Sequence, residues 1–325
     1  MSAGGCLISS DFRAPWWLKS AHLQTAFATL FRRRPRIGLR RERIALTDGD
    51  FLDLDWTPRP QGPVVLVLHG LEGSSDSPYA RGMLETAHAH GWRGAVMHFR
   101  GCSGVPNRLP RSYHSGDTGD LSEVVDGLTA RSDVSALVVV GYSLGGNVLL
   151  KWLGEQGAGA PIEAAVAVSV PYTLSLAADR LATGLSQLYQ RRLIADLCTK
   201  LRRKFTPSTS PIDLDLAASS RNFWEFDDRV TAPLHGFEDV HDYYMRSSSR
   251  QFLGAIRVPT LMLHAKDDPF MTPDVLPSRD ELSPDTRLEI SAAGGHVGFV
   301  HGSLPWRPRY WLEERIPAFL ENYIG

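Results

Sequence analysis

The chain has few cysteines and no long apolar stretch, and both absences limit what it can be. Its 325 residues include three cysteines, Cys6, Cys102 and Cys198, without a C-x-x-C pair. Widely spaced cysteines in odd number supply neither a disulfide framework nor a zinc knuckle, and they suit a reducing compartment. The sequence contains no apolar window of the roughly 20 residues that a membrane span needs, and no basic leader followed by an apolar run. We therefore expect a cytoplasmic protein without a transmembrane span.

An excess of charge of one sign is also missing, as are the motifs of nucleotide and metal chemistry. The formal net charge is −1, so no overall field attracts nucleic acid. Arginines do cluster in residues 31–43, where a solvated surface and a site for an anionic surface both stay open. The sequence has no G-x-x-x-x-G-K-[ST], no dinucleotide-binding glycine fingerprint and no H-E-x-x-H. We expect no nucleic-acid partner, no cofactor and no metal.

What the sequence does have is a regular alternation of strand and helix patterns. With 43% hydrophobic residues, a chain of this length can build one large core with an insertion. Apolar and polar residues alternate on both sides of the segment 48–50, "DGD", which predicts two antiparallel strands. From Val64 onward, apolar strand-like runs alternate with helical patterns near residues 78–90, 118–130 and 145–157. This alternation is typical of a mostly parallel, doubly wound α/β sheet.

The alternation stops at residue 172 and resumes at residue 259, which predicts an insertion. A connecting loop is rarely this long, and the inserted residues 172–258 are rich in helix-forming and aromatic side chains. We expect a mainly helical cap here, with residues 41–171 and 259–325 forming the core. Residues 1–40 are predicted to be an N-terminal extension that packs on the core. Within it, the segment 15–31 could instead form an interfacial amphipathic helix, although packing on its own domain is favoured.

One segment has the pattern of a nucleophile elbow. Residues 141–145 read G-x-S-x-G, between a buried strand pattern and a helix pattern. The glycines leave room where a sharp turn brings backbone segments close together. The pattern predicts that Ser143 is a nucleophile, and the alternative is a tight glycine turn with a spectator hydroxyl.

A nucleophilic serine needs a base and an acid, which follow it in this order of strands as Asp and then His. One later strand pattern ends at Asp267 and Asp268, and the next ends at His296 behind two glycines. We prefer Asp268 as the acid because it stands three residues after Ala265 at the strand end, and Asp267 is the alternate. His69 and His264 are weaker candidates for the base and are expected to be structural.

The loop "HGLEG", residues 69–73, follows a buried strand directly and is the candidate oxyanion hole. Acyl transfer needs donors aimed at the developing oxyanion, and we assign this role to the backbone amides of Leu71 and Leu144. The alternative is that His69 and Gly70 merely turn the chain.

Taken together, the elbow, "HGLEG", "HFRGCSG", "AKDDPF" and "GGHVGF" resemble the α/β-hydrolase superfamily. The stretches "WWLKSAHLQT", "FRGCSG" and "FDDRVTAPLHGFEDVHDYY" resemble its YheT-like branch, which includes bacterial hydrolases and mammalian membrane-anchored esterases. The resemblance implies an α/β-hydrolase fold, a triad of Ser143, Asp268 and His296, and carboxylesterase or monoacylglycerol-lipase-like activity. The membrane-anchored relatives carry an N-terminal span that this sequence lacks.

We therefore predict a serine hydrolase that cleaves short- to medium-chain carboxylic esters through an acyl-enzyme on Ser143, with monoacylglycerols among the candidate substrates. The expected partner is a small-molecule or lipid ester, and peripheral contact with a membrane stays open. Two alternatives remain. The same triad could transfer the acyl group to an alcohol or amine, or the chain could be a non-catalytic binding protein on a hydrolase scaffold.

Overall fold

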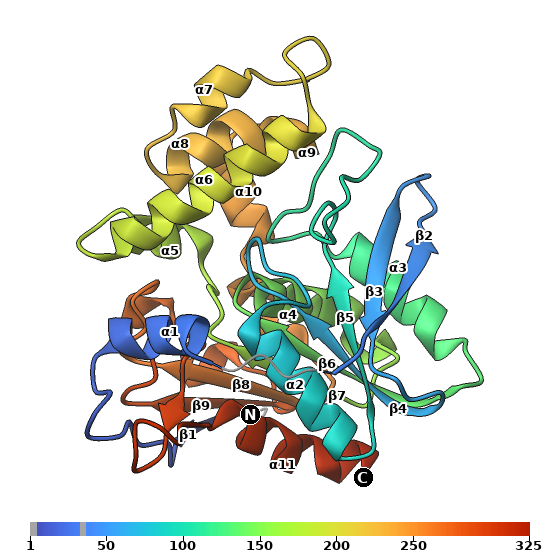
Figure 1. Cartoon of the computed structure of the whole chain (residues 1–325), viewed down its shortest axis with the longest axis vertical. Coiled ribbons are helices and arrows are strands. Elements are labelled where there is room, and N and C mark those ends of the chain that lie inside the picture. The colour runs from blue at the N-terminus through green and yellow to red at the C-terminus, as the bar shows by residue number, and fades with distance from the viewer. Residues whose placement is uncertain (1–4, 33–36) are drawn as a thin grey trace.

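The computed structural model describes residues 5–32 and 37–325. It has a central sheet with helices on both faces, and a further group of helices rises above one end of that sheet (Figure 1). The predicted mostly parallel α/β sheet with a mainly helical insertion is confirmed. Residues 33–36, which are part of the arginine-rich segment 31–43, lie outside the described residues.

Nine strands form the central sheet in the order β1-β9-β8-β7-β6-β4-β5-β3-β2. Strand β3 runs antiparallel to both of its neighbours, and every other pair is parallel. A separate pair, β10 (Val300–His301) and β11 (Arg309–Tyr310), is antiparallel. The nine strands are β1 (Cys6–Ser9), β2 (Arg40–Ala45), β3 (Phe51–Trp56), β4 (Gly62–Leu68), β5 (Arg93–His98), β6 (Val134–Tyr142), β7 (Ala164–Val168), β8 (Thr260–Ala265) and β9 (Thr286–Ser291).

Apolar side chains cover both faces of the parallel strands, which explains their continuous branched-aliphatic runs. On β4, Val65 and Val67 face one apolar cluster, whereas Leu66 and Leu68 face the other. Helices α2 and α11 contribute to the first cluster, and α3 and α4 contribute to the second. These four helices are α2 (Pro78–Ala89), α3 (Gly119–Thr129), α4 (Leu144–Gln156) and α11 (Leu312–Ile324).

Between β7 and β8 the chain leaves the sheet and forms the cap, by which we mean the helices from Leu174 to Ser247. The cap has an apolar cluster of its own, separate from the two clusters that sandwich the sheet. In Figure 1 it stands above the sheet, where the carboxyl ends of the strands point. Its helices are α5 (Leu174–Leu181), α6 (Ser186–Lys204), α7 (Leu214–Ala218), α8 (Phe223–Phe226), the π-helix η2 (Asp227–Thr231), α9 (Ala232–His235) and α10 (Val240–Ser247).

Four short 3-10 helices complete the described secondary structure. They are η1 (Gly157–Gly159), η3 (Arg250–Ala255), η4 (Pro273–Val275) and η5 (Arg279–Glu281). Helix η3 packs against α4 as the chain returns from the cap to the sheet. In the described parts of the chain, none of the helices combines the length and the apolar composition that crossing a membrane requires.

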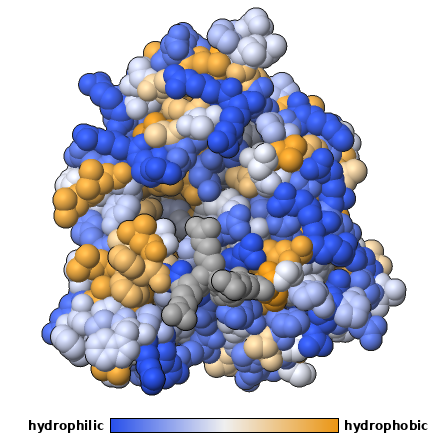
Figure 2. All heavy atoms as spheres, viewed as in Figure 1, coloured by the Kyte–Doolittle hydropathy of each residue, from blue (hydrophilic) through white to orange (hydrophobic). Residues whose placement is uncertain are grey.

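The N-terminal segment contributes to the sheet as well as packing on it. Strand β1 extends the sheet beside β9, a pairing that the sequence pattern does not predict. Helix α1 (Ala21–Leu30) follows, with Gln24 and Thr25 buried and Leu23 exposed. Figure 2 shows apolar surface gathered over α1 and around the start of α6, where Leu185 and Leu188 are exposed.

Candidate active site

Ser143 occupies the sharp turn between β6 and α4. Its backbone has φ 52° and ψ −118°, a strained conformation for a residue with a side chain. The strain is held in place because the Ser143 N–H donates to the Val168 carbonyl at 2.8 Å. A Cβ atom on Gly141 would lie 2.5 Å from the Gly145 carbonyl oxygen, and one on Gly145 would lie 2.6 Å from the His69 carbonyl oxygen. Both flanking positions therefore require glycine.

The structure brings Ser143, Asp268 and His296 together at the carboxyl ends of β6, β8 and β9. The His296 Nε2 lies 3.0 Å from the Ser143 Oγ, and the His296 Nδ1 lies 2.8 Å from the Asp268 Oδ2. The Asp268 side chain is 1% exposed, and its Oδ1 accepts a hydrogen bond from the Phe270 N–H. A carboxylate beside Nδ1 keeps the proton there, so that Nε2 is free to accept the proton of the serine.

Asp267, the alternate acid, lies beside the histidine loop, by which we mean residues 292–300, and makes no hydrogen bond to the imidazole. Its Oδ1 accepts a hydrogen bond from the Gly295 N–H at 3.0 Å. Burial raises the pKa of Asp267 above its ordinary value. The geometry gives Asp267 the task of bracing the turn that precedes His296.

The two weaker histidine candidates are buried, and neither forms a hydrogen bond with Ser143. The His69 Nδ1 lies 2.7 Å from the Gly70 carbonyl, and its Nε2 accepts from the Phe99 N–H at 3.1 Å. Burial lowers the pKa of His69 to about 3 and that of His264 to about 4. Both rings stay neutral near pH 7, and the hydrogen bonds of His69 shape the turn at the end of β4.

The candidate oxyanion loop lies beside the elbow. Leu71 and Leu144 line the same pocket as Ser143. The loop is held by the Tyr79 hydroxyl, which accepts from the Gly70 N–H at 2.8 Å, and by Glu72, which accepts from Lys200 of α6 at 2.8 Å. The Leu144 N–H is at the first position of α4, where no acceptor exists within the helix. Both loop and helix end can therefore present amides to the pocket.

Two residues that the sequence reasoning missed, Gln24 and Thr25, connect α1 to the histidine loop. The Thr25 Oγ1 accepts from the His296 N–H at 2.9 Å. Gln24 is fully buried, accepts from the Val300 N–H at 2.7 Å and donates to the Val300 carbonyl at 2.9 Å. The histidine loop has positive φ at Val297, 56°, and it needs this external support. The available signal was a pair of adjacent polar residues, Gln24 and Thr25, in a helix with many apolar residues.

Asn147, on the first turn of α4, is the other missed residue. It is fully buried and donates to the Ser115 carbonyl at 2.7 Å and to the Ser247 carbonyl at 2.8 Å. Its Oδ1 accepts from the Ser249 N–H at 3.0 Å. The side chain thus joins the helix behind the elbow to the end of the cap.

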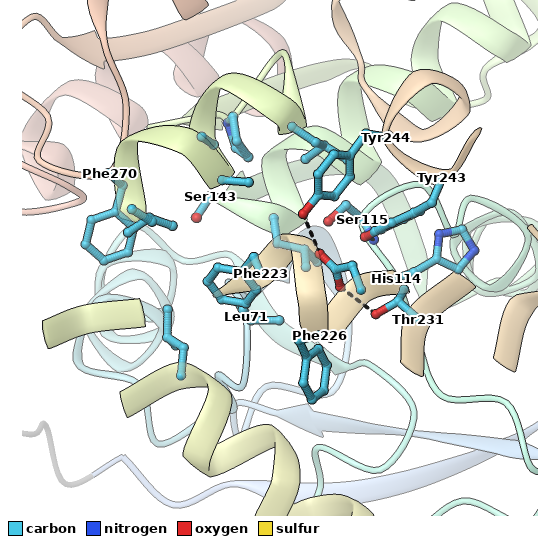
Figure 3. A pocket seen from close by; sticks show the side chains of 18 of the residues that line it. Leu71, His114, Ser115, Ser143, Phe223, Phe226, Thr231, Tyr243, Tyr244 and Phe270 are labelled. Carbon is cyan, nitrogen blue, oxygen red and sulfur yellow. Dashed lines mark hydrogen bonds between the residues drawn. The ribbon is translucent and has the colours of Figure 1, made fainter. Parts of the chain in front are cut away.

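A cavity that is partly open to solvent lies between the cap and the side chains of Ser143 and His296. Figure 3 shows Ser143 and Phe270 on one side of it and Tyr243, Tyr244 and Thr231 on the other. The Phe270 ring stacks on the His296 ring with centroids 4.0 Å apart. Most of the lining is apolar, including Leu174, Ala178, Leu193, Phe223, Phe226 and Met271.

Comparison with known proteins decides the family. The alpha/beta hydrolase fold family matches residues 63–303. The chain belongs to this family. As an α/β-hydrolase it is also similar, over nearly its whole length, to YheT of Escherichia coli (strain K12), which is provisionally named an esterase. The two are 44% identical, over 97% of this chain and 94% of YheT. The resemblance to the YheT-like branch is thereby confirmed.

More distant relatives of this α/β-hydrolase have enzymatic names. Mouse phospholipase ABHD3 is 29% identical over 97% of this chain and 80% of its own. The monoacylglycerol lipase of Saccharomyces cerevisiae is 30% identical over 80% of this chain and 59% of its own. The prediction of a hydrolase enzyme is confirmed.

Solved structures agree on the fold. The Pyrococcus furiosus esterase Pf2001 superimposes with a TM-score of 0.59 at 17% identity, over 99% of this chain and 100% of that one. Est1E from Butyrivibrio proteoclasticus, with bound ferulic acid, gives 0.54 at 15% identity, over 87% of this chain and 99% of that one. At such identities the likeness concerns the fold alone.

Proposed function

We propose that this α/β-hydrolase is a serine esterase that cleaves carboxylic esters through an acyl-enzyme on Ser143. The observation that carries the proposal is the hydrogen-bonded series Ser143, His296 and Asp268, which opens onto an apolar cavity. Neither His69 nor His264, the other two histidines considered, has a serine hydroxyl at one ring nitrogen and a carboxylate at the other.

The geometry supports a two-step mechanism. The His296 Nε2 takes the Ser143 proton while Oγ attacks the acyl carbon, and Asp268 stabilises the imidazolium. The amides of Leu71 and Leu144 donate to the oxyanion. His296 then protonates the leaving alcohol, and water activated by the same histidine releases the acid.

The lining of the cavity favours uncharged esters with an apolar acyl group, and we propose short- to medium-chain acids. Its apolar side chains suit an acyl chain, and no lysine or arginine stands among its described lining residues to neutralise a phosphate. The yeast relative's name, monoacylglycerol lipase, points the same way. We therefore place monoacylglycerols among the candidate substrates, ahead of phospholipids.

The decisive experiment measures hydrolysis of p-nitrophenyl esters, from acetate to palmitate, by the wild type and by Ser143→Ala. We expect turnover to fall by roughly ten-thousand-fold or more in the variant, because removal of the nucleophile leaves only binding and oxyanion stabilisation. Fluorophosphonate should label the wild type and not the variant. Normal turnover by Ser143→Ala would refute the proposal. Labelling without hydrolysis of any ester would favour acyl transfer.

We further infer a reducing, cytoplasmic location. Cys6, Cys102 and Cys198 all carry free thiols, which suits such a compartment. Fractionation of cells that express the protein tests this inference.

A further inference from the structure

A single carboxyl group projects into the cavity from the cap. Asp227 begins the π-helix η2, and it lines the same cavity as Ser143 and His296. The Thr231 hydroxyl donates to its Oδ1 at 2.6 Å, and the Tyr244 hydroxyl donates to its Oδ2 at 2.7 Å. Figure 3 draws both hydrogen bonds as dashed lines on the side of the cavity opposite Phe270.

The hydrogen-bonding capacity of this carboxylate is only half used. Each of its oxygens can accept two hydrogen bonds and accepts one. Within residues 5–32 and 37–325, no lysine, arginine or histidine forms an ion pair with Asp227. The neighbouring Tyr243 hydroxyl accepts from the Ser115 N–H and makes no hydrogen bond to Asp227, and burial raises the pKa of Asp227 to about 6.

Such an arrangement is costly for a purely structural carboxylate. An ionised group in an apolar site without a counter-charge loses much of its favourable hydration. A group that faces a ligand cavity with unused acceptor positions can recover part of this loss when a ligand donates a hydrogen bond. The position of Asp227 in the cavity of the triad makes the ester substrate the ligand concerned.

We propose that Asp227, held by Thr231 and Tyr244, binds a free hydroxyl group on the alcohol part of the substrate. The enzyme would then prefer monoesters of a polyol to plain alkyl esters of the same acid. This inference rests on the proposed esterase function and names its substrate class.

A neutral hydroxyl fits this site better than an ion does. A hydroxyl can donate to the ionised carboxylate and can accept from the protonated one, so both states of Asp227 bind it. An ammonium group would have to leave water for a largely apolar cavity, which costs much more. An anionic group would be repelled by Asp227 and would find no cationic side chain among the described lining residues.

The test compares three octanoate esters that differ in the alcohol: octanoyl glycerol, propyl octanoate and octanoylcholine. The readout is the ratio of kcat/KM for the glycerol ester to kcat/KM for the propyl ester. We expect Asp227→Leu to lower this ratio by about 10- to 100-fold, since the substrate hydroxyl loses a hydrogen bond to a charged group. Tyr244→Phe should lower it by about 2- to 10-fold.

The matched control is Asp228→Asn. Asp228 is the exposed neighbour of Asp227, and its Oδ1 accepts from the Val240 N–H at 3.2 Å, a role that the amide oxygen of asparagine retains. The ratio should not change in this variant. If Asp227→Leu does not fold, Tyr244→Phe, which removes one of the two hydroxyl groups that hold the carboxylate, gives the comparison.

Four outcomes would overturn the proposal. An equal loss of activity on the glycerol and propyl esters in Asp227→Leu would assign Asp227 to the structure of the cap. A larger loss with octanoylcholine than with octanoyl glycerol would make the subsite cation-binding. A wild type that hydrolyses none of the three esters would refute both this proposal and the proposed esterase function. A wild type that hydrolyses propyl octanoate as fast as octanoyl glycerol would refute only the role of Asp227, and the esterase function would stand.

Discussion

The core and the cap pair their buried carboxylates in different ways. In the core, the Arg100 guanidinium donates to both oxygens of Asp120, at 2.6 and 2.7 Å, and to Asp50 at 2.9 Å. The Asp268 carboxylate lies 2.8 Å from the Nδ1 of His296. The positive charge of Arg100 thus matches Asp120 and Asp50 in the core, and it fixes these side chains in place whether or not a ligand is bound.

The cap treats Asp227 differently, because only hydroxyl groups hold it. A carboxylate that is hydrogen-bonded only to neutral groups has no counter-charge and has free acceptor positions, so a ligand can still donate a hydrogen bond to it. The difference teaches that Asp268 in the core already has its partner before a ligand binds, whereas the electrostatic balance around Asp227 in the cap depends on what enters the cavity. Four predictions test this division.

The largest effect is expected at the acid of the core. Asp268→Asn should lower kcat by about a thousand- to ten-thousand-fold, since an amide at this position no longer fixes the imidazole tautomer or stabilises the imidazolium. Asp267→Asn is the matched control, and its kcat should fall less than about tenfold, because its oxygen only braces Gly295. Steady-state kinetics on p-nitrophenyl butyrate would decide between them. A greater loss in Asp267→Asn would reassign the acid.

The second prediction concerns the junction of core and cap. Asn147→Ala should lower the free energy of unfolding by about 3 kcal/mol, since three buried backbone groups lose their partner. Asn222→Ala removes a helix cap from α8 and should cost only about 1 kcal/mol. Urea unfolding of both variants measures the contrast. Equal losses would mean that Asn147 does not join the two regions.

The third prediction concerns the contact between helix α1 and the backbone of His296. Thr25→Val should lower kcat by about tenfold with little change in KM, because the His296 N–H loses its acceptor and the imidazole shifts from its position. Thr25→Ser retains a hydroxyl and should restore most of kcat. Kinetics of the two variants, checked by unchanged circular dichroism, test this support. A KM effect alone would contradict it.

The smallest effect is a change of stability with pH in the cap. Asp227 has a pKa of about 6 in the folded protein against an ordinary value of 3.8. The folded state therefore binds more protons between these values, and stability falls as the pH rises through them. Asparagine cannot ionise, so the Tm of Asp227→Asn relative to the wild type should rise by roughly 2 °C between pH 4 and pH 7. A constant difference across this range would show that Asp227 keeps its ordinary pKa.

The sequence predicts the core better than the cap for a physical reason. Val64 to Leu68 and the runs of β6 and β7 are buried on both faces, and such runs are recognisable without a structure. The elbow glycines and the strand ends locate Ser143, Asp268 and His296, which the structure brings within hydrogen-bond distance. The catalytic roles of these residues stay predictions.

What the sequence does not reveal depends on contacts between distant segments. Strand β1 pairs with β9 across almost the whole chain, and its four residues carry no distinct pattern. The supporting role of Gln24 and Thr25 becomes visible only in the folded chain, where the histidine loop lies against α1. The π-helix that turns Asp227 into the cavity has no periodicity by which to find it.

The contact of α1 with the histidine loop also has a consequence for biosynthesis. During synthesis Thr25 leaves the ribosome early, Ser143 in the middle and His296 near the end. The backbone N–H of His296 is nevertheless hydrogen-bonded to Thr25, in the segment that is made first. Long-range pairings of this kind form late in folding. A nascent chain that has exposed the elbow but not β9 therefore has Ser143 without His296 beside it, and under the proposed mechanism hydrolysis begins only after synthesis is almost complete.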